Sequence, residues 1–212
     1  MDSFLELASG RRSIRKYENG DIPEADVEYF IKAAVTAPSG CNSQCWRFVA
    51  VRDRAVIEDL AQTVMRKTEE LLSAGNGSVT GQYMASKKKM VSFFEKAPLV
   101  IAVFMTRLEF YDPAEIALLK SQGYDDEGIM KLFASPDILS VGAAVQNLLL
   151  AVHEKGYGAC WMNEPAVAGA EINRILGIPE EERFMSLIPV GIPAYTPRNK
   201  DMKPMSQIFN IV

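Results

Sequence analysis

The chain has 212 residues, a mass of 23.5 kDa, and 48% hydrophobic and 24% charged residues, which predicts one large or at most two small globular domains. Its 23 Lys and Arg against 27 Asp and Glu leave a net charge of −4, which argues against nucleic acid or an anionic membrane as a partner. Three cysteines are too few for a disulfide framework, and one histidine excludes a multi-histidine metal site.

The first half of the chain alternates expected helices with one expected strand. A short amphipathic helix opens it, and apolar residues spaced three and four apart predict a second helix over Pro23–Val35. That helix ends at the breaker cluster Ala37–Gly40, which begins a loop reaching Cys45. A strand is expected next at Trp46–Val51, and a helix at about Arg54–Leu72.

The second half continues the alternation. A helix is expected over Gly81–Phe94, and Pro98–Met105 predicts a buried strand because its apolar residues do not alternate with polar ones. One or two short helices are expected within 113–133. Asp137–Glu154 is apolar nearly all round, which predicts a helix running through the core. The remaining expected elements are a strand at Ala159–Met162, a helix at Val167–Leu176 and a strand at Phe184–Val190.

This order of elements predicts an α+β or α/β domain on a sheet of four or five strands. The tail ends in an apolar stretch, 208–212, of a kind that often docks on a partner subunit. The longest apolar run, 97–105, is shorter than the roughly 20 residues that span a bilayer. The first residues also lack a basic segment followed by an apolar one, so we expect a cytoplasmic protein with no membrane partner.

Two polar segments are suited to holding a ligand. Residues 11–16 gather four cations and a hydroxyl, which match the oxygens of a phosphate, although a solvated basic turn has the same composition. Residues 38–44 combine Ser, Asn and Gln side chains with a glycine, which suits a planar ligand but is also common in ordinary loops. The pattern predicts structural roles for His153, near a helix end, and for Cys41, as a packing residue.

Four ordered motifs together resemble the FMN-dependent nitroreductase family over nearly the whole chain. Its opening R-R-S-x-R signature stands at Arg11, Arg12, Ser13 and Arg15, and its P-S-x-x-N-x-Q-x-W loop at Pro38, Ser39, Asn42, Gln44 and Trp46. Its helix and following turn stand at Gly142–Ala151 and Gly156–Met162, and its closing segment at Pro189–Pro193 and Pro197–Lys200.

The resemblance implies the architecture. It implies an α+β fold with a central, mostly antiparallel sheet of four to five strands flanked by helices. The whole chain, 1–212, would be one FMN-binding domain, with a variable lid at about 75–135. Family members are homodimers that hold FMN between the subunits, so we expect a homodimer here, with the C-terminal tail exchanged between its subunits.

The resemblance also implies the residues that contact FMN. Arg11, Arg12 and Ser13 would hold its phosphate and ribityl chain, helped by Arg198 and Lys200. Arg15 would lie at the pyrimidine edge, where a cation stabilises negative charge at N1. The other subunit would supply Pro38, Ser39, Gly40, Asn42 and Gln44. The ring near N5 would be lined by Trp161, Met162, Asn163 and Glu164. The last two of these are alternative donors to N5, because the family's Gly-rich sequence is replaced here.

The implied activity needs no catalytic side chain and no metal. NAD(P)H would deliver hydride to flavin N5 and leave, and a nitroaromatic, a quinone or a related electron-poor acceptor would take its place in a ping-pong mechanism. The absence of a G-x-G-x-x-G motif after a strand agrees with transient binding of NAD(P)H over FMN. Alternatives are a flavin reductase, an FMN-consuming or dehalogenating member of the same fold, and a flavin-binding protein without turnover.

Overall fold

Four strands form one antiparallel sheet in the order β1-β2-β4-β3, in the part of the chain that the computed structural model describes, residues 3–73, 80–106, 112–198 and 201–212. The strands are β1 (Trp46–Val51), β2 (Leu99–Met105), β3 (Gly158–Ala159) and β4 (Arg183–Gly191). The third strand ends before the expected Met162, although the Cys160 N–H still donates to the Pro189 carbonyl of β4 and Met162 bridges β4 at Leu187; no residue pairs with β4 on this side before Leu187 in the described chain. The first residues of β4 therefore have an open edge.

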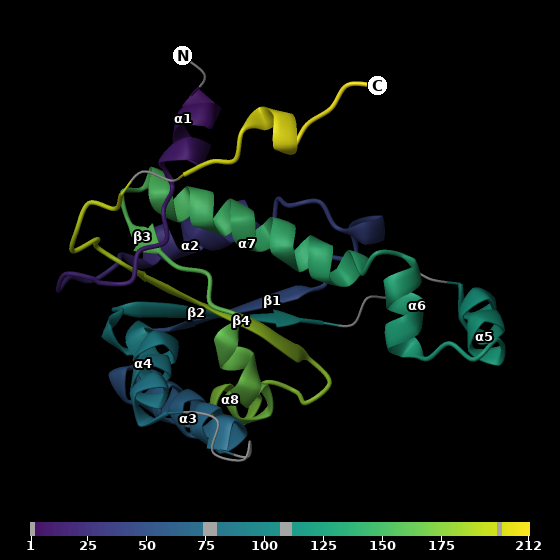
Figure 1. Cartoon of the computed structure of the whole chain (residues 1–212), viewed down its shortest axis with the longest axis horizontal. Coiled ribbons are helices and arrows are strands. Elements are labelled where there is room, and N and C mark those ends of the chain that lie inside the picture. The colour runs from purple at the N-terminus through teal and green to yellow at the C-terminus, as the bar shows by residue number, and fades with distance from the viewer. Residues whose placement is uncertain (1–2, 74–79, 107–111, 199–200) are drawn as a thin grey trace.

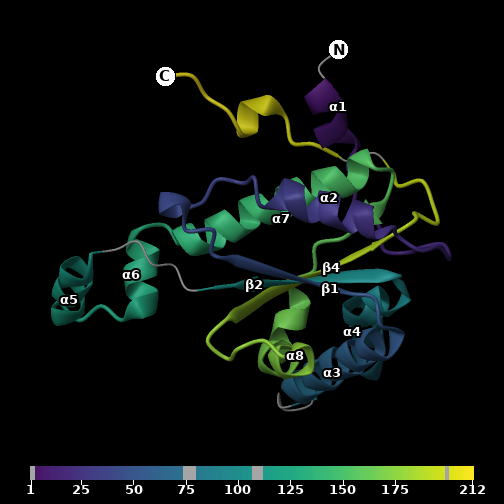
Figure 2. The same cartoon turned by 180° about the vertical axis from the view of Figure 1, so that it is seen from behind.

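Helices cover both faces of the sheet (Figure 1 and, from behind, Figure 2). One face carries α2 (Glu24–Ala34) and α7 (Pro136–Glu154); the other carries α3 (Arg54–Ser73), α4 (Gly81–Ser92) and α8 (Gly169–Leu176). In β2, Leu99, Ile101 and Val103 pack under the first pair of helices, while Val100, Ala102 and Phe104 pack over the second group. Because both faces are covered, this strand has no polar alternation.

The helix α7 is part of the core on its face of the sheet, as its apolar sequence predicted, but it is not buried all round. Its outer residues Ile138 and Leu139 are 41% and 63% exposed. Only one side of this helix can contact the sheet, and no other element in the described residues covers this part of its outer face. The first turn of α7 therefore presents apolar side chains to solvent.

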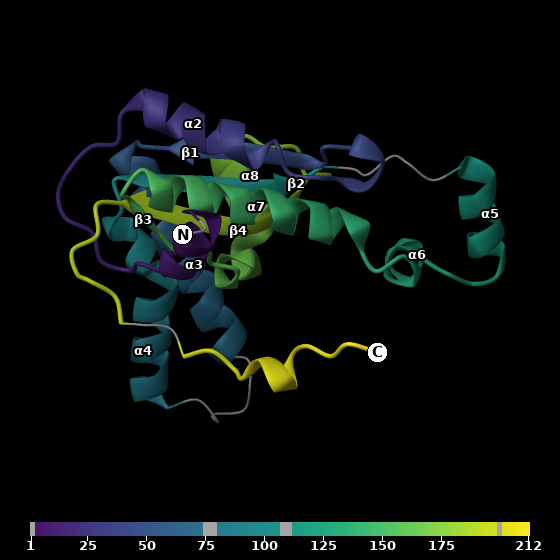
Figure 3. The ribbon, with the colours of Figure 1, turned by 90° about the horizontal axis from the view of Figure 1, so that it is seen from above.

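Two segments extend away from the main body. The helices α5 (Pro113–Ser121) and α6 (Asp126–Leu132) project beyond the end of the sheet, as the view from above shows (Figure 3). The helix α1 (Ser3–Gly10) and the C-terminal tail lie outside α7 (Figure 1). Apolar tail residues, including Ile208, Phe209 and Ile211, are more than half exposed. The tail thus has apolar side chains that its own subunit does not bury.

Two expected helices have different ends in the structure. The helix expected over Val167–Leu176 is a short 3-10 helix, η3 (Glu164–Ala168), followed by α8. The helix expected over Gly81–Phe94 gives way after Ser92 to a second 3-10 helix, η2 (Phe93–Lys96). No single helix within the described ranges is long and apolar enough to cross a membrane, and only α6 and α7, which are bent by 67° at their junction, reach that limit together.

Candidate functional site

The basic segment 11–16 is docked along β3. The Ile14 backbone N–H donates to the Ala159 carbonyl at 2.9 Å, and Ser13 forms a parallel bridge with Ala159. The close approach depends on Gly158, because a Cβ there would lie 2.6 Å from the Ile14 side chain. Further along, the Tyr17 hydroxyl donates to the Ile14 carbonyl at 2.8 Å. The segment is therefore held rigidly at the edge of the sheet and is no flexible solvated turn.

The two adjacent arginines of this segment differ in what they contact. The Arg12 guanidinium donates to the carbonyls of Ser9, Arg11 and Arg198, the last at 3.1 Å. By contrast, Arg11 Nε is buried and has no hydrogen-bond partner among the described residues. A buried donor without a partner costs about 1–3 kcal/mol, so this atom is suited to an anionic ligand. Arg12 binds backbone and ties down the tail.

Thus Arg198 does reach the basic segment, through its backbone carbonyl, whereas its side chain is exposed. Lys200 lies outside the described residues.

A buried thiol, Cys160, lies beside the same segment. Burial raises the pKa of Cys160, while the charges of Arg15 and Arg11 and a hydrogen bond from Ser13 act in the opposite direction. The thiol is therefore protonated at neutral pH and is a poor nucleophile. No three His, Cys, Asp or Glu side chains in the described ranges are grouped to hold a metal ion.

The polar loop 38–44 lies at the opposite end of α7. The Gly40 backbone N–H donates to Ser140 Oγ at 3.2 Å, near the start of the helix, whereas Gly10 of α1 packs against His153, near its end. These thirteen residue steps correspond to about 20 Å at 1.5 Å per residue. Within one chain, the loop and the basic segment therefore contact opposite ends of this helix.

The loop itself has an unusual backbone. Cys41, Asn42 and Gln44 all have positive φ values, of 49°, 54° and 47°. Such conformations in residues other than glycine are costly and are concentrated at functional sites. The Ser39 hydroxyl stabilises this shape by accepting from the Gln44 N–H at 3.0 Å. Cys41 is exposed, so the prediction that it is a packing residue is wrong: the left-handed turn directs it away from the core.

A cavity of about 1120 Å³ lies at the open edge of β4, between α7 and α8. Gly142 and Ala143 form one apolar wall, and Trp161 and Asn163 lie at the end nearest β3. The side chain of Met162 packs in the core instead, at 3% exposure, and its backbone N–H and carbonyl both pair with Leu187 of β4. Of the four residues predicted to line a ring, Trp161 and Asn163 therefore reach this cavity.

The fourth, Glu164, faces away from the cavity toward α4. Its Oε1 lies 3.6 Å from Lys87 Nζ, which links the turn after β3 to α4. Of the alternative donors Asn163 and Glu164, only Asn163 lines the cavity.

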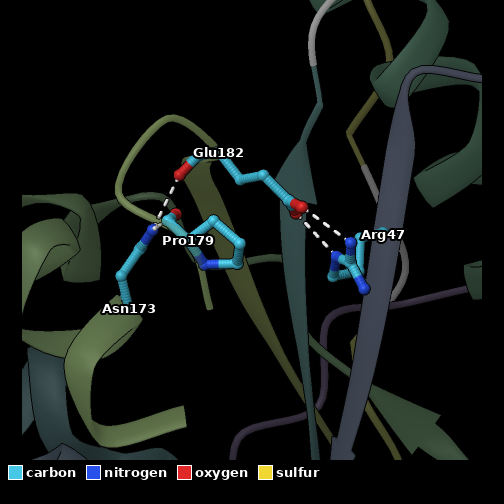
Figure 4. A network of polar contacts seen from close by, with 4 residues as sticks. All are labelled: Arg47, Asn173, Pro179 and Glu182. Atoms are coloured by element: carbon cyan, nitrogen blue, oxygen red, sulfur yellow. Dashed lines mark hydrogen bonds and ion pairs between the residues drawn. The ribbon is translucent and has the colours of Figure 1, made fainter. Parts of the chain in front are cut away.

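The other end of the cavity is polar and is held by a network that the sequence did not reveal (Figure 4). Asn173 Nδ2 donates to the carbonyls of Pro179 and Glu182 at 2.8 and 2.7 Å. The Glu182 carboxylate accepts two hydrogen bonds of 2.6 Å from Arg47 of β1. The turn before β4 is thereby fixed to both α8 and β1. No local motif marks these residues, because they meet only through the fold.

We expect Asn173→Ala to lower the free energy of unfolding by about 1–3 kcal/mol, since two carbonyls lose a donor in a site where Asn173 is only 3% exposed. Asn147→Ala is the matched control, because its bonds are longer, at 3.3 and 3.4 Å, and more accessible. Urea unfolding of both variants measures the difference. Equal losses would contradict a special role for the Asn173 network.

Comparison with known proteins gives consistent matches over nearly the full length. The sequence model described as "Nitroreductase family" matches residues 8–192. A protein of Methanothermobacter thermautotrophicus named "Putative NADH dehydrogenase/NAD(P)H nitroreductase" is 29% identical over 93% of this chain and 81% of its own length. Human iodotyrosine deiodinase 1 is 27% identical over 97% of this chain and 67% of its own length.

Among solved structures, a BluB-like flavoprotein from Clostridium difficile 630 superposes with a TM-score of 0.85. It is 29% identical in sequence, and the match covers 100% of both chains. The α+β architecture predicted from the sequence is thus confirmed both by the structure itself and by its neighbour.

Proposed function

This chain belongs to the nitroreductase family, and from that premise we propose that it is a flavoprotein that holds FMN between two copies of itself and transfers hydride from NAD(P)H to an electron-poor organic acceptor. The observation that carries the proposal is the buried, unpartnered Arg11 Nε in a segment fixed against β3. A phosphate monoester would satisfy that donor and is the anionic part of FMN. The cavity beginning at Trp161 offers adjacent room for a planar ring.

The chain's own residues would bind, orient and shield. Arg11 and Ser13 would hold the phosphate and ribityl chain, while Arg12 keeps the tail in place through the Arg198 carbonyl. Arg15, which is exposed, would supply positive charge at the pyrimidine edge, and Asn163 would face the ring near N5. Bound FMN would accept and donate the hydride. The raised pKa of the Cys160 thiol leaves it no role as a nucleophile.

We further propose that the working form is a homodimer. The loop 38–44 and the basic segment lie at opposite ends of α7, so a second copy would have to supply the loop residues Pro38, Ser39, Gly40, Asn42 and Gln44. The exposed Ile138 and Leu139 on α7 and the apolar tail would then be covered by the partner. Exchange of the tail between subunits is the simplest way to bury it.

Deleting residues 205–212 tests the tail. We expect the shortened dimer to dissociate at protein concentrations at least tenfold higher than the full chain does. The deletion removes four exposed apolar residues that would be buried against the partner: Met205, Ile208, Phe209 and Ile211. Light scattering over a dilution series measures the dissociation. Replacing exposed Met202 by Ala, outside the deleted segment, is a milder control. An unchanged dimer would exclude the tail from the interface.

The proposed function is tested by the absorbance spectrum of the purified protein after FMN is added, followed by anaerobic addition of NADH or NADPH. Flavin bands that bleach and return with a quinone or a nitroaromatic support the redox cycle and identify the donor. A protein that takes up no FMN contradicts the proposal. A yellow protein that neither nucleotide bleaches points to flavin binding without turnover.

A second candidate activity, reductive dehalogenation, is favoured by the similarity to iodotyrosine deiodinases. The flavin-loaded protein, once chemically reduced, would then release iodide from added 3-iodotyrosine, and an iodide electrode measures that iodide. The same preparation tested with a nitroaromatic separates the two activities, because each consumes reducing equivalents on a different acceptor. Loss of the flavin spectrum during aerobic turnover would indicate an FMN-consuming member instead.

A further inference from the structure

The single histidine of the chain lies against the basic segment. His153 stands in the last turn of α7 and is half-buried. A Cβ on Gly10 would lie 2.8 Å from His153 Nε2, so the imidazole packs directly on the backbone that precedes Arg11. The sequence suggested only a structural helix-end role, because nothing local connects residue 153 with residues 11 and 12.

The charges acting on this imidazole are mainly positive. Burial lowers the pKa of His153 below its usual value, and the nearby Arg11 and Arg12 lower it further. On its own helix, Glu154 accepts from the Tyr29 hydroxyl of α2, and Lys155 lies 3.4 Å from Asp26 of α2. From α1, Glu6 is the acidic residue one helical turn before Gly10.

We propose that His153 is a further member of the anion site and takes up a proton when a phosphate monoester binds Arg11. The position of the site follows from the packing of His153 on Gly10 and from the unpartnered Arg11 Nε. That the ligand is FMN rests on the proposed function. Arg11 Nε supplies an unpartnered donor for the anion. Negative charge there offsets the repulsion between the arginines and a protonated imidazole, so the imidazolium becomes stable once the phosphate is in place.

The sign of the pH dependence follows from linkage. Binding raises the pKa of His153 relative to the free protein, so the bound state holds more protons. Phosphate binding is therefore strengthened as the pH falls, and this gain is lost as the pH rises through the pKa of the bound state. Each unit of difference between the two pKa values corresponds to about tenfold in affinity. Riboflavin, which lacks the phosphate, should show no such coupling.

The first test uses the fact that the chain has one histidine. In isotope-labelled protein without a histidine tag, NMR follows the His153 Cε1–Hε1 signal against pH. We expect the midpoint in the free protein to lie below that of an ordinary histidine, to rise with FMN, and not to change with riboflavin. An equal midpoint in all three states overturns the proposal. If neither flavin binds, the proposed function fails, and the response of the signal to inorganic phosphate alone decides the inference.

The second test compares FMN affinity at pH 6 and pH 8 in the natural protein, His153→Gln and Glu154→Gln. The phosphate itself titrates near pH 6, so FMN affinity changes with pH even without His153. His153→Gln measures that change and serves as the reference. We expect the gain in affinity at pH 6 to be about three- to tenfold larger in the natural protein than in His153→Gln. Glu154→Gln, which changes the neighbouring residue on the side facing Tyr29, should keep the natural slope. The same slope in His153→Gln overturns the proposal.

Discussion

Replacing Arg11 by alanine should weaken FMN binding by about 1.5–3 kcal/mol, which is roughly 10- to 150-fold in Kd. The expected loss is this large because Arg11 Nε is already desolvated and has no competing partner in the described protein. The neighbouring Arg12 cannot compensate, since its guanidinium is engaged with three backbone carbonyls. Quenching of flavin fluorescence during titration measures Kd.

Two comparisons make the Arg11 result specific. Riboflavin should lose little affinity in Arg11→Ala, because it has no phosphate to contact the guanidinium. Lys16→Ala removes an exposed cation from the same segment and should change Kd for FMN by less than about threefold, as expected for a screened surface charge. Equal weakening for FMN and riboflavin would show that Arg11 acts on the ring or on the fold and not on the phosphate.

The sequence predicts most of the fold because its signals are local. The continuous apolar residues of β2 indicate a strand buried on both faces, and both core clusters do use it. The short third strand was overestimated for a reason that is not local. Beyond Ala159 the chain stays beside β4 through the Cys160 N–H, which donates to the Pro189 carbonyl, and through the bridge of Met162 to Leu187. The residues of β4 before Leu187 have no such neighbour and line the cavity.

The candidate site also combines residues that local sequence marks with residues that only the fold brings together. The basic segment and the polar loop are contiguous in sequence, so their composition alone marks them. His153 and Arg47 contribute through contacts with residues more than 90 positions away, Gly10 and Glu182. Asn173 contributes through a nearby turn whose shape follows from packing. The assignment of the loop to a second subunit comes from family resemblance and stays a prediction.

Gly158→Ala should lower the free energy of unfolding by about 3 kcal/mol, at the upper end of the usual cost of overpacking. The added methyl group would lie 2.6, 2.7 and 2.8 Å from three atoms of Ile14, which is a branched side chain at 4% exposure with little freedom to move. Gly81→Ala is the matched control: a Cβ there meets nothing within 4 Å, so its stability should be unchanged or slightly higher.

Gly158→Ala should also reduce FMN binding. The added methyl group would push Ile14 away from β3, and the neighbouring Ser13–Ala159 bridge holds the basic segment there. Unfolding is therefore measured without flavin, and binding separately under conditions where the variant is folded. Combining Gly158→Ala with Ile14→Ala removes two of the three clashing atoms, so the double variant should lose less stability than the sum of the single losses. Additive losses would mean that residue 158 and Ile14 do not interact energetically, and that the position of Arg11 does not depend on their contact.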